Sequence, residues 1–86
     1  MKKFIIKIKY SWGHEEEPIL INSNNKTDSF YYMIDLAIKE TKTAIKEHND
    51  DISVCIFPKD YDILLDYVYD GTQCYYELKE EEEENE

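Results

Sequence analysis

The sequence predicts an α+β domain, in which an antiparallel sheet of four or five strands carries one amphipathic helix on one face. Residues 3–10 alternate between apolar and polar side chains, which is the pattern of a half-buried strand. Residues 30–48 instead repeat apolar side chains every three to four positions, which is the pattern of a helix with one buried face. Short β-rich segments lie on both sides of that helix, so the expected order of elements is β-β-α-β-β-β.

The first two predicted strands form a hairpin. In residues 3–10, KFIIKIKY, every second residue from Phe4 to Tyr10 is apolar, and lysines occupy most of the positions between them. Residues 11–18 contain Gly and Pro and are expected to be a loop. Residues 19–22, ILIN, are short and β-rich. Two strands with a connection of this length most simply pair with each other.

A single helix follows the hairpin. The polar cluster NSNNKTDS, residues 22–29, offers Thr27, Asp28 or Ser29 as the N-cap. The helix is expected to end near residues 48–50, where a His suits the negative end of the helix dipole and is not expected to be catalytic. The apolar side of the helical wheel carries Phe30, Met33, Ile34, Ala37, Ile38, Thr41, Ile45 and His48.

Three more strands complete the prediction. Residues 52–57, ISVCIF, are a third strand. The pair Asp70 and Gly71 is a strong signal for a two-residue type I′ turn, so residues 61–79 are expected to form a hairpin. A helix through residues 60–69 is an alternative, because apolar residues in that segment are also helically spaced.

The predicted turn also fixes a register. It pairs Leu65 with Tyr76 on an apolar face, and it pairs Asp62 with Lys79 on the opposite face. One register thus sorts the apolar residues to one side and pairs a carboxylate with an ammonium group, which favours the hairpin over the helix.

Negative charge is concentrated in the second half of the chain. The net charge is −10 at pH 7. Residues 1–46 hold eight Lys and six acids, whereas residues 47–86 hold two Lys and fourteen acids. Such asymmetry indicates a charged interaction surface or an acidic tail. We expect residues 1–79 to form a single domain and residues 80–86, EEEEENE, to be a disordered acidic tail.

Catalytic and metal sites are not expected. Gly13 and Gly71 are the only glycines and have no phosphate-binding motif around them. Neither His is placed in sequence beside a Ser or Cys that it would activate. His14 with the three glutamates after it is a weak set of metal ligands, so we expect no bound metal. Without a phosphate-binding loop or an activated nucleophile, we also expect no enzymatic activity and no cofactor. Cys55 and Cys74 lie in predicted strands without a CxxC motif and are expected to be reduced.

Direct binding to nucleic acid or to a membrane is not expected either. A chain with a net charge of −10 is repelled by a polyanionic backbone, and the lysines of the first strand and the helix are expected to face solvent. No stretch approaches the roughly 18 apolar residues of a membrane span, and Lys7 interrupts the apolar residues near the N-terminus. We expect a cytoplasmic protein.

The acidic C-terminal hairpin is therefore the candidate partner-binding surface. Side chains on one face of a strand repeat about every 6.6 Å, so alternate residues of the hairpin would form a ladder of carboxylates. Apolar residues surrounded by acids are more typical of a protein interface than of a sheet face that only contacts solvent. Fixed carboxylates can stand in for phosphates in a groove lined by Lys and Arg. The candidate residues are Asp60, Asp62, Leu64, Asp66, Val68, Asp70, Tyr75, Glu77, Glu80 and Glu81.

In its size, its net charge and the acidic hairpin of residues 60–84, the chain resembles the small acidic proteins by which phages and mobile elements inhibit nucleases. These are anti-CRISPR proteins and anti-restriction DNA mimics. The resemblance is one of class, because no motif matches residue by residue, and it carries over no functional positions. It implies a non-enzymatic inhibitor that occupies the basic groove of a nucleic-acid-binding protein or nuclease complex and blocks the entry of DNA or RNA.

Three other interpretations fit the same residues. One is an immunity protein or antitoxin that neutralises a cognate basic nuclease toxin. Another is a small homodimer in which Leu64, Val68 and Tyr75 pair across a two-fold axis while the acids keep the dimer soluble. The last is a solvated sheet face without a partner.

Overall fold

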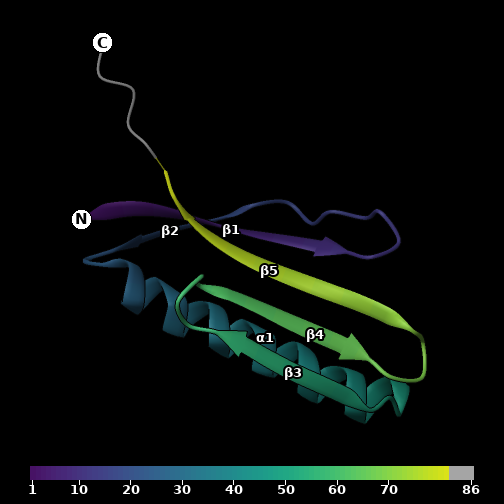
Figure 1. The fold of residues 1–86 in the computed structure, drawn as a ribbon. Helices are drawn as coiled ribbons and strands as arrows, with labels where there is room; N and C mark the ends of the chain where they lie inside the picture. Colours follow the sequence, from purple (N-terminus) through teal and green to yellow (C-terminus); the bar gives the residue numbers. More distant parts are fainter. Residues whose placement is uncertain (82–86) are drawn as a thin grey trace.

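The computed structural model describes residues 1–81, which have the predicted α+β architecture (Figure 1). One helix and five strands follow one another within these residues in the predicted order, and residues 62–67 form a strand and not the alternative helix. The elements are β1 (Lys2–Tyr10), β2 (Ile19–Ser23), α1 (Lys26–His48), β3 (Ile52–Phe57), β4 (Asp62–Tyr67) and β5 (Thr72–Glu80).

The strands form one antiparallel sheet in the order β2-β1-β5-β4-β3. Helix α1 lies along one face of this sheet and contacts all five strands (Figure 1). No other element of residues 1–81 covers the opposite face, so alternate residues of each strand face either the core or solvent. The core contains Phe4, Ile6, Phe30, Met33, Ala37, Ala44, Ile63, Leu65, Tyr67, Cys74, Tyr76 and Leu78.

Helix α1 begins earlier than the sequence predicted, and a different residue caps it. Asn25 is the N-cap, and its side-chain oxygen accepts a 2.9 Å hydrogen bond from the N–H of Asp28. Asn25 has an extended backbone and the helix begins at the next residue, Lys26. The predicted caps Thr27, Asp28 and Ser29 therefore lie inside the helix. Asn49 closes the other end in a left-handed conformation with a φ of 51°.

The buried stripe of α1 is rotated from the predicted one. Ile38 and Ile45, both predicted to be buried, are 43% and 49% exposed, and His48 is exposed as well. The small side chains of Ala37 and Ala44 lie in the contact with the sheet and allow a close approach, which leaves the larger isoleucines on the flank of the helix. The buried residues of α1 are Ser29, Phe30, Met33, Ala37 and Ala44.

Strands β4 and β5 form the predicted hairpin with a different loop and register. The loop contains residues 68–71, whereas the prediction placed only the Asp-Gly pair in the turn. Asp62 therefore lies opposite Glu77 and Leu65 lies opposite Cys74, so the predicted pairings of Asp62 with Lys79 and of Leu65 with Tyr76 are both wrong. Because the partners shift by an even number of positions, the side chains within β4 and β5 keep their predicted faces. Val68 and Asp70, predicted on the face of Asp62, instead lie in the loop.

Contacts with the segment between α1 and β3 hold this longer loop. The Asp50 carboxylate accepts hydrogen bonds from the N–H groups of Asp51 (2.8 Å) and Tyr69 (3.0 Å). The N–H of Val68 donates to the C=O of Asp51 at 2.9 Å. Gly71 completes the loop in a left-handed conformation, with a φ of 68° that suits glycine. These partners are distant in sequence, so the local Asp-Gly signal does not reveal them.

Strand β5 extends into the predicted tail. Glu80 is its last residue, and the N–H of Glu81 donates to the C=O of Lys3 at 2.9 Å. The first two residues of the predicted disordered tail, 80–86, are therefore attached to β1. Residues 82–86 lie outside the described residues.

Candidate functional site

The face of the sheet that α1 leaves open gathers five of the predicted site residues. Along each strand, the side chains on this face alternate with those of the core. Strand β4 contributes Asp62, Leu64 and Asp66, and strand β5 contributes Tyr75 and Glu77. These five residues share one face, as the period-two pattern predicts.

We call Asp62, Leu64, Asp66 and Tyr75 the acidic patch. Its two aspartates lie on one strand, about 13 Å apart along it. Leu64 lies between them and opposite Tyr75 on the neighbouring strand. All four residues are half-buried, and neither aspartate takes part in a salt bridge within residues 1–81. The patch thus presents two unpaired carboxylates around an apolar centre.

A short hydrogen bond fixes the aromatic ring of the patch. The Tyr75 hydroxyl donates to Oδ2 of Asp62 at 2.5 Å. This bond, followed by desolvation and by the nearby carboxylates, raises the pKa of Tyr75 to about 12. The phenol is therefore neutral at physiological pH, and it remains a donor that orients the Asp62 carboxylate.

Glu77 marks the boundary between an acidic and a basic half of the open face. Its carboxylate lies 3.8 Å from Nζ of Lys9 and 3.6 Å from Nζ of Lys79. Lys7 lies directly opposite Glu77 on β1, and alternation places Lys3 on the same face. The charge of Glu77 is therefore compensated, and among the strand residues of this face within residues 1–81 the carboxylates without a salt bridge are those of β4.

Strand β3 adds apolar residues that the candidate list did not contain. Cys55 lies opposite Leu64, and Phe57 lies opposite Asp62. Cys55 is exposed, and Phe57 is 42% exposed. The alternating pattern of residues 52–57 gives the face of each residue, but only the strand order reveals that β3 lies next to β4.

Four other candidate residues lie outside the acidic patch. Asp60 is exposed in the turn before β4, and Val68 is 53% exposed in the β4–β5 loop. Glu80 lies by alternation on the helix-facing side of the sheet, with its carboxylate 4.0 Å from Nζ of Lys2. Glu81 is exposed just beyond β5. The carboxylate ladder is therefore shorter than the sequence predicts.

A hollow of about 250 Å³ opens beside the acidic patch on the same face. One of its walls is made by Leu64 and Tyr75, so the apolar centre of the patch continues into a depression. The N–H of Gln73 donates to the Ser11 hydroxyl oxygen at 2.9 Å and ties β5 to the segment after β1. The residues around the hollow are Lys9, Tyr10, Ser11, Leu64, Gln73 and Tyr75.

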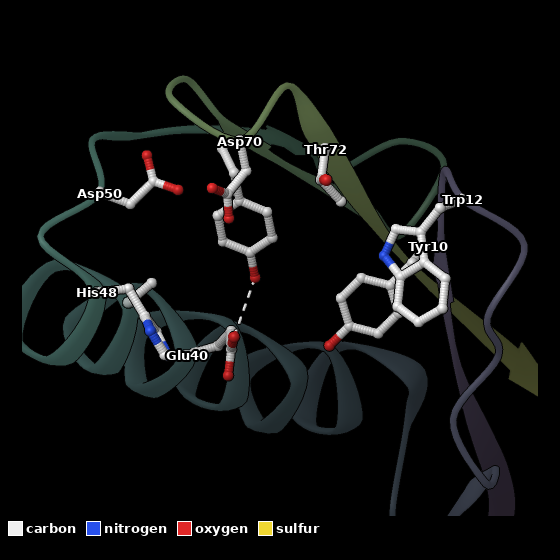
Figure 2. Close-up of a pocket in the computed structure, with 9 residues that line it drawn as sticks. Tyr10, Trp12, Glu40, His48, Asp50, Asp70 and Thr72 are labelled. Atoms are coloured by element: carbon white, nitrogen blue, oxygen red, sulfur yellow. Dashed lines mark hydrogen bonds between the residues drawn. The ribbon is translucent and has the colours of Figure 1, made fainter.

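Asp70 belongs to a different cleft, of about 190 Å³, between the C-terminal part of α1 and the sheet (Figure 2). Within it the Tyr67 hydroxyl donates to Oε1 of Glu40 at 3.0 Å, and burial together with this carboxylate raises the pKa of Tyr67. Sequence reasoning missed this cleft because its residues come from separate segments. They are Tyr10, Trp12, Glu40, Ala44, His48, Asp50, Tyr67, Asp70 and Thr72.

The loop after β1 does not assemble a metal site. The ring of His14 stacks on Trp12 with centroids 5.0 Å apart and planes 8° apart. Its Nε2 lies 3.2 Å from Oε1 of Glu16. Within residues 1–81, no three side chains of His, Cys, Asp or Glu are arranged to hold a metal ion. Both cysteines are free thiols, Cys55 exposed and Cys74 buried.

Comparisons with known proteins assign no function to this fold. No protein-family model, curated protein or solved structure matches the chain. Within the described residues, no helix combines the length and the apolar character needed to cross a membrane. Function is therefore inferred from the chemistry of the open face.

Proposed function

We propose that the protein is a non-enzymatic inhibitor that binds the basic groove of a nucleic-acid-binding protein or nuclease through its acidic patch. The observation that carries this proposal is the pair of carboxylates, Asp62 and Asp66, which lie on a sheet face that no other element of residues 1–81 covers and which have no salt bridge to a lysine within those residues. A strand within a five-stranded sheet holds both groups at a fixed spacing, so little conformational entropy is lost when a partner binds.

The surroundings of these carboxylates suit Arg and Lys side chains. A guanidinium group binds a carboxylate with two parallel hydrogen bonds and also stacks on an aromatic ring. The acidic patch offers both kinds of contact, because Tyr75 lies beside Asp62 and opposite Leu64. The hollow next to Tyr75 can receive the aliphatic part of a long basic side chain.

The charge of the whole chain supports the same kind of partner. A net charge of −10 attracts a basic surface over distances of about one Debye length and accelerates association at low salt. The lysines of β1 repel a cationic partner from the other half of the face. The proposed contact is therefore limited to β3, β4 and the adjacent side of β5.

The proposal is tested by affinity capture from a nuclease-treated bacterial lysate at low and high salt. Three immobilised proteins are compared: the wild type, Asp62→Asn/Asp66→Asn, and the control Asp35→Asn/Glu47→Gln. The control removes the same charge from exposed positions of α1, away from the open face. Captured proteins are then tested for loss of binding to labelled duplex DNA or RNA.

We expect the wild type and the control to capture a nucleic-acid-binding protein at low salt, and the patch variant to lose it. The captured protein should release labelled nucleic acid when the wild-type inhibitor is added. A single captured nuclease toxin would identify the narrower role of an immunity protein. Equal capture by both variants, no nucleic-acid-binding protein captured at low salt, or a captured protein that keeps its nucleic acid would contradict the proposal.

A further inference from the structure

We infer that the outer edge of β3 pairs with β3 of a second copy of this chain, in antiparallel fashion and centred on Val54. This contact joins two five-stranded sheets into one continuous sheet. It is independent of the proposed function, because it uses the edge of the sheet and leaves the acidic patch on β4 and β5 uncovered.

The backbone of β3 has unused hydrogen-bonding groups on its outer side. The C=O of Asp51 accepts from the N–H of Val68, which shows that the odd-numbered residues of β3 direct their backbone groups toward β4. The N–H and C=O groups of Ile52, Val54 and Ile56 therefore point outward. No strand of residues 1–81 pairs with this edge.

The side chains along this edge are unusually apolar for so acidic a chain. Val54 and Ile56 are 40% and 43% exposed on the side of the sheet that carries α1. Residues 52–57 contain no charged residue and no proline, which is the composition that sheet proteins avoid at a free edge. Such an edge is a template for pairing with another strand.

The exposed flank of α1 lies on the same side of the molecule. The Phe30 ring packs edge-on against Tyr61, which lies in the turn between β3 and β4. On the helical wheel, the exposed Ile38 and Ile45 lie next to the buried stripe on the side of Phe30, and therefore on the side nearer β3. A second copy joined at β3 places its own helix on the same side of the extended sheet. The exposed isoleucines of both helices then border the seam between the two copies.

The geometry of β3 favours a second copy over an unrelated peptide, because the edge is complementary to itself. With the two-fold axis at Val54, Ile52 of each copy lies opposite Ile56 of the other, and every outward backbone group of these three residues gains a partner. A register centred on Cys55 instead places Pro58, which has no N–H, opposite Ile52.

Charge also favours this register. The seam itself is uncharged, so the net charge of −10 on each copy is not concentrated at the contact. Beyond the seam, the register aligns Lys59 of each copy with Asn49 of the other, two positions from Asp51, so a lysine and an aspartate occur near each end of the paired strands.

The register is tested by disulfide formation. Ser53 lies opposite Cys55 of the other copy as a non-hydrogen-bonded pair, with Cα atoms about 4.5 Å apart, which is within reach of a disulfide. Mild oxidation of Ser53→Cys should give a covalent dimer linked between residues 53 and 55, as mapped by peptide mass spectrometry. The control Thr43→Cys places an additional thiol on an exposed position of α1 and should not give this product.

The non-covalent contact is tested by sedimentation of the wild type and of Val54→Lys. The variant adds a charge at an exposed position, so circular dichroism should show an unchanged fold while the dimer is lost. A wild type that stays monomeric at every accessible concentration would overturn the inference. So would a link between two Cys55 residues, or a dimer that persists in Val54→Lys, since that dimer would use another surface such as Leu64 and Tyr75.

Discussion

Tyr75 contacts both an aspartate of the acidic patch and the hollow beside it. Its hydroxyl donates to the Asp62 carboxylate, and the same residue lines the hollow beside β1. The sequence correctly predicts the face on which Tyr75 and Asp62 lie, because alternation is a local property of a strand. It does not predict that these two residues bond to each other, because that contact depends on a register set by a distant anchor.

Replacement of Tyr75 by Phe should lower the free energy of unfolding by about 1 kcal/mol at neutral pH, because one hydrogen bond to a half-buried carboxylate is lost. The folded pKa of about 12 exceeds the ordinary value of 10, so the neutral phenol is the stabilised form. The difference between wild type and variant should be complete below pH 10 and should disappear as the pH rises toward 12.

Urea unfolding at pH 7 and spectrophotometric titration of tyrosine check this prediction. Tyr31→Phe is the control, because Tyr31 is 62% exposed on α1 and lies away from the patch. If Tyr75→Phe is as stable as the control at pH 7, the Tyr75–Asp62 bond does not contribute as described.

At the scale of elements, caps and loops are the places where sequence and structure disagree. Thr27, Asp28 and Ser29 are good cap residues by type, yet Asn25 comes earlier and already satisfies the N–H of Asp28. A polar cluster with several cap residues leaves the first turn of a helix undetermined, because the choice depends on how the preceding strand β2 ends.

Asn25→Ala should therefore destabilise the protein by about 1 kcal/mol, because the N–H of Asp28 loses its acceptor. Thr27→Ala, at a position that the sequence had offered as the cap, should have a much smaller effect. Thermal unfolding of both variants measures the difference. A larger loss for Thr27→Ala than for Asn25→Ala would show that the helix begins later than Lys26.

The β4–β5 loop illustrates a different limit of local signals. Asp70 and Gly71 are the residues of a two-residue turn, but the buried Asp50 carboxylate binds the N–H of Tyr69 and keeps this residue out of the strand. A side chain nineteen positions before Tyr69 thus helps to set the register, which places Glu77 and not the predicted Lys79 opposite Asp62.

Asp50→Ala should cost about 2 kcal/mol, because two N–H groups lose a charged acceptor in a mostly buried position. Asp50→Asn keeps a side-chain carbonyl and should retain part of this stability. Asp51→Ala removes the same charge from an exposed neighbour and serves as the control. Equal urea midpoints for Asp50→Ala and Asp51→Ala would mean that the carboxylate does not hold the loop.

At the scale of the whole molecule, the order of elements and the faces of the strands follow from the sequence, whereas the order of strands in the sheet does not. Apolar periodicity together with the Asp-Gly turn signal correctly predicts all five strands and the helix, because burial on one side of a small domain is strongly patterned. The central place of β5 between β1 and β4 is long-range information. It places Lys7 and Lys9 beside Glu77 and divides the open face into a basic and an acidic half.

This division means that the net charge of −10 is not spread evenly over the open face. A ladder of acids along the entire hairpin would bind cations non-specifically, whereas two unpaired carboxylates around Leu64 and Tyr75 define a small site bordered by lysines. Salt should therefore weaken partner binding, but it should strengthen the proposed pairing of β3 edges, since screening reduces repulsion between two copies of charge −10.

The acidic patch as the binding site is tested by the affinity of the captured partner for the two charge-matched variants, determined by calorimetry at low salt. We predict that Asp62→Asn/Asp66→Asn binds at least about tenfold more weakly than Asp35→Asn/Glu47→Gln, a difference of about 1.4 kcal/mol or more. Equal affinities would show that the partner responds only to net charge, and the open face of the sheet would then not be the binding site.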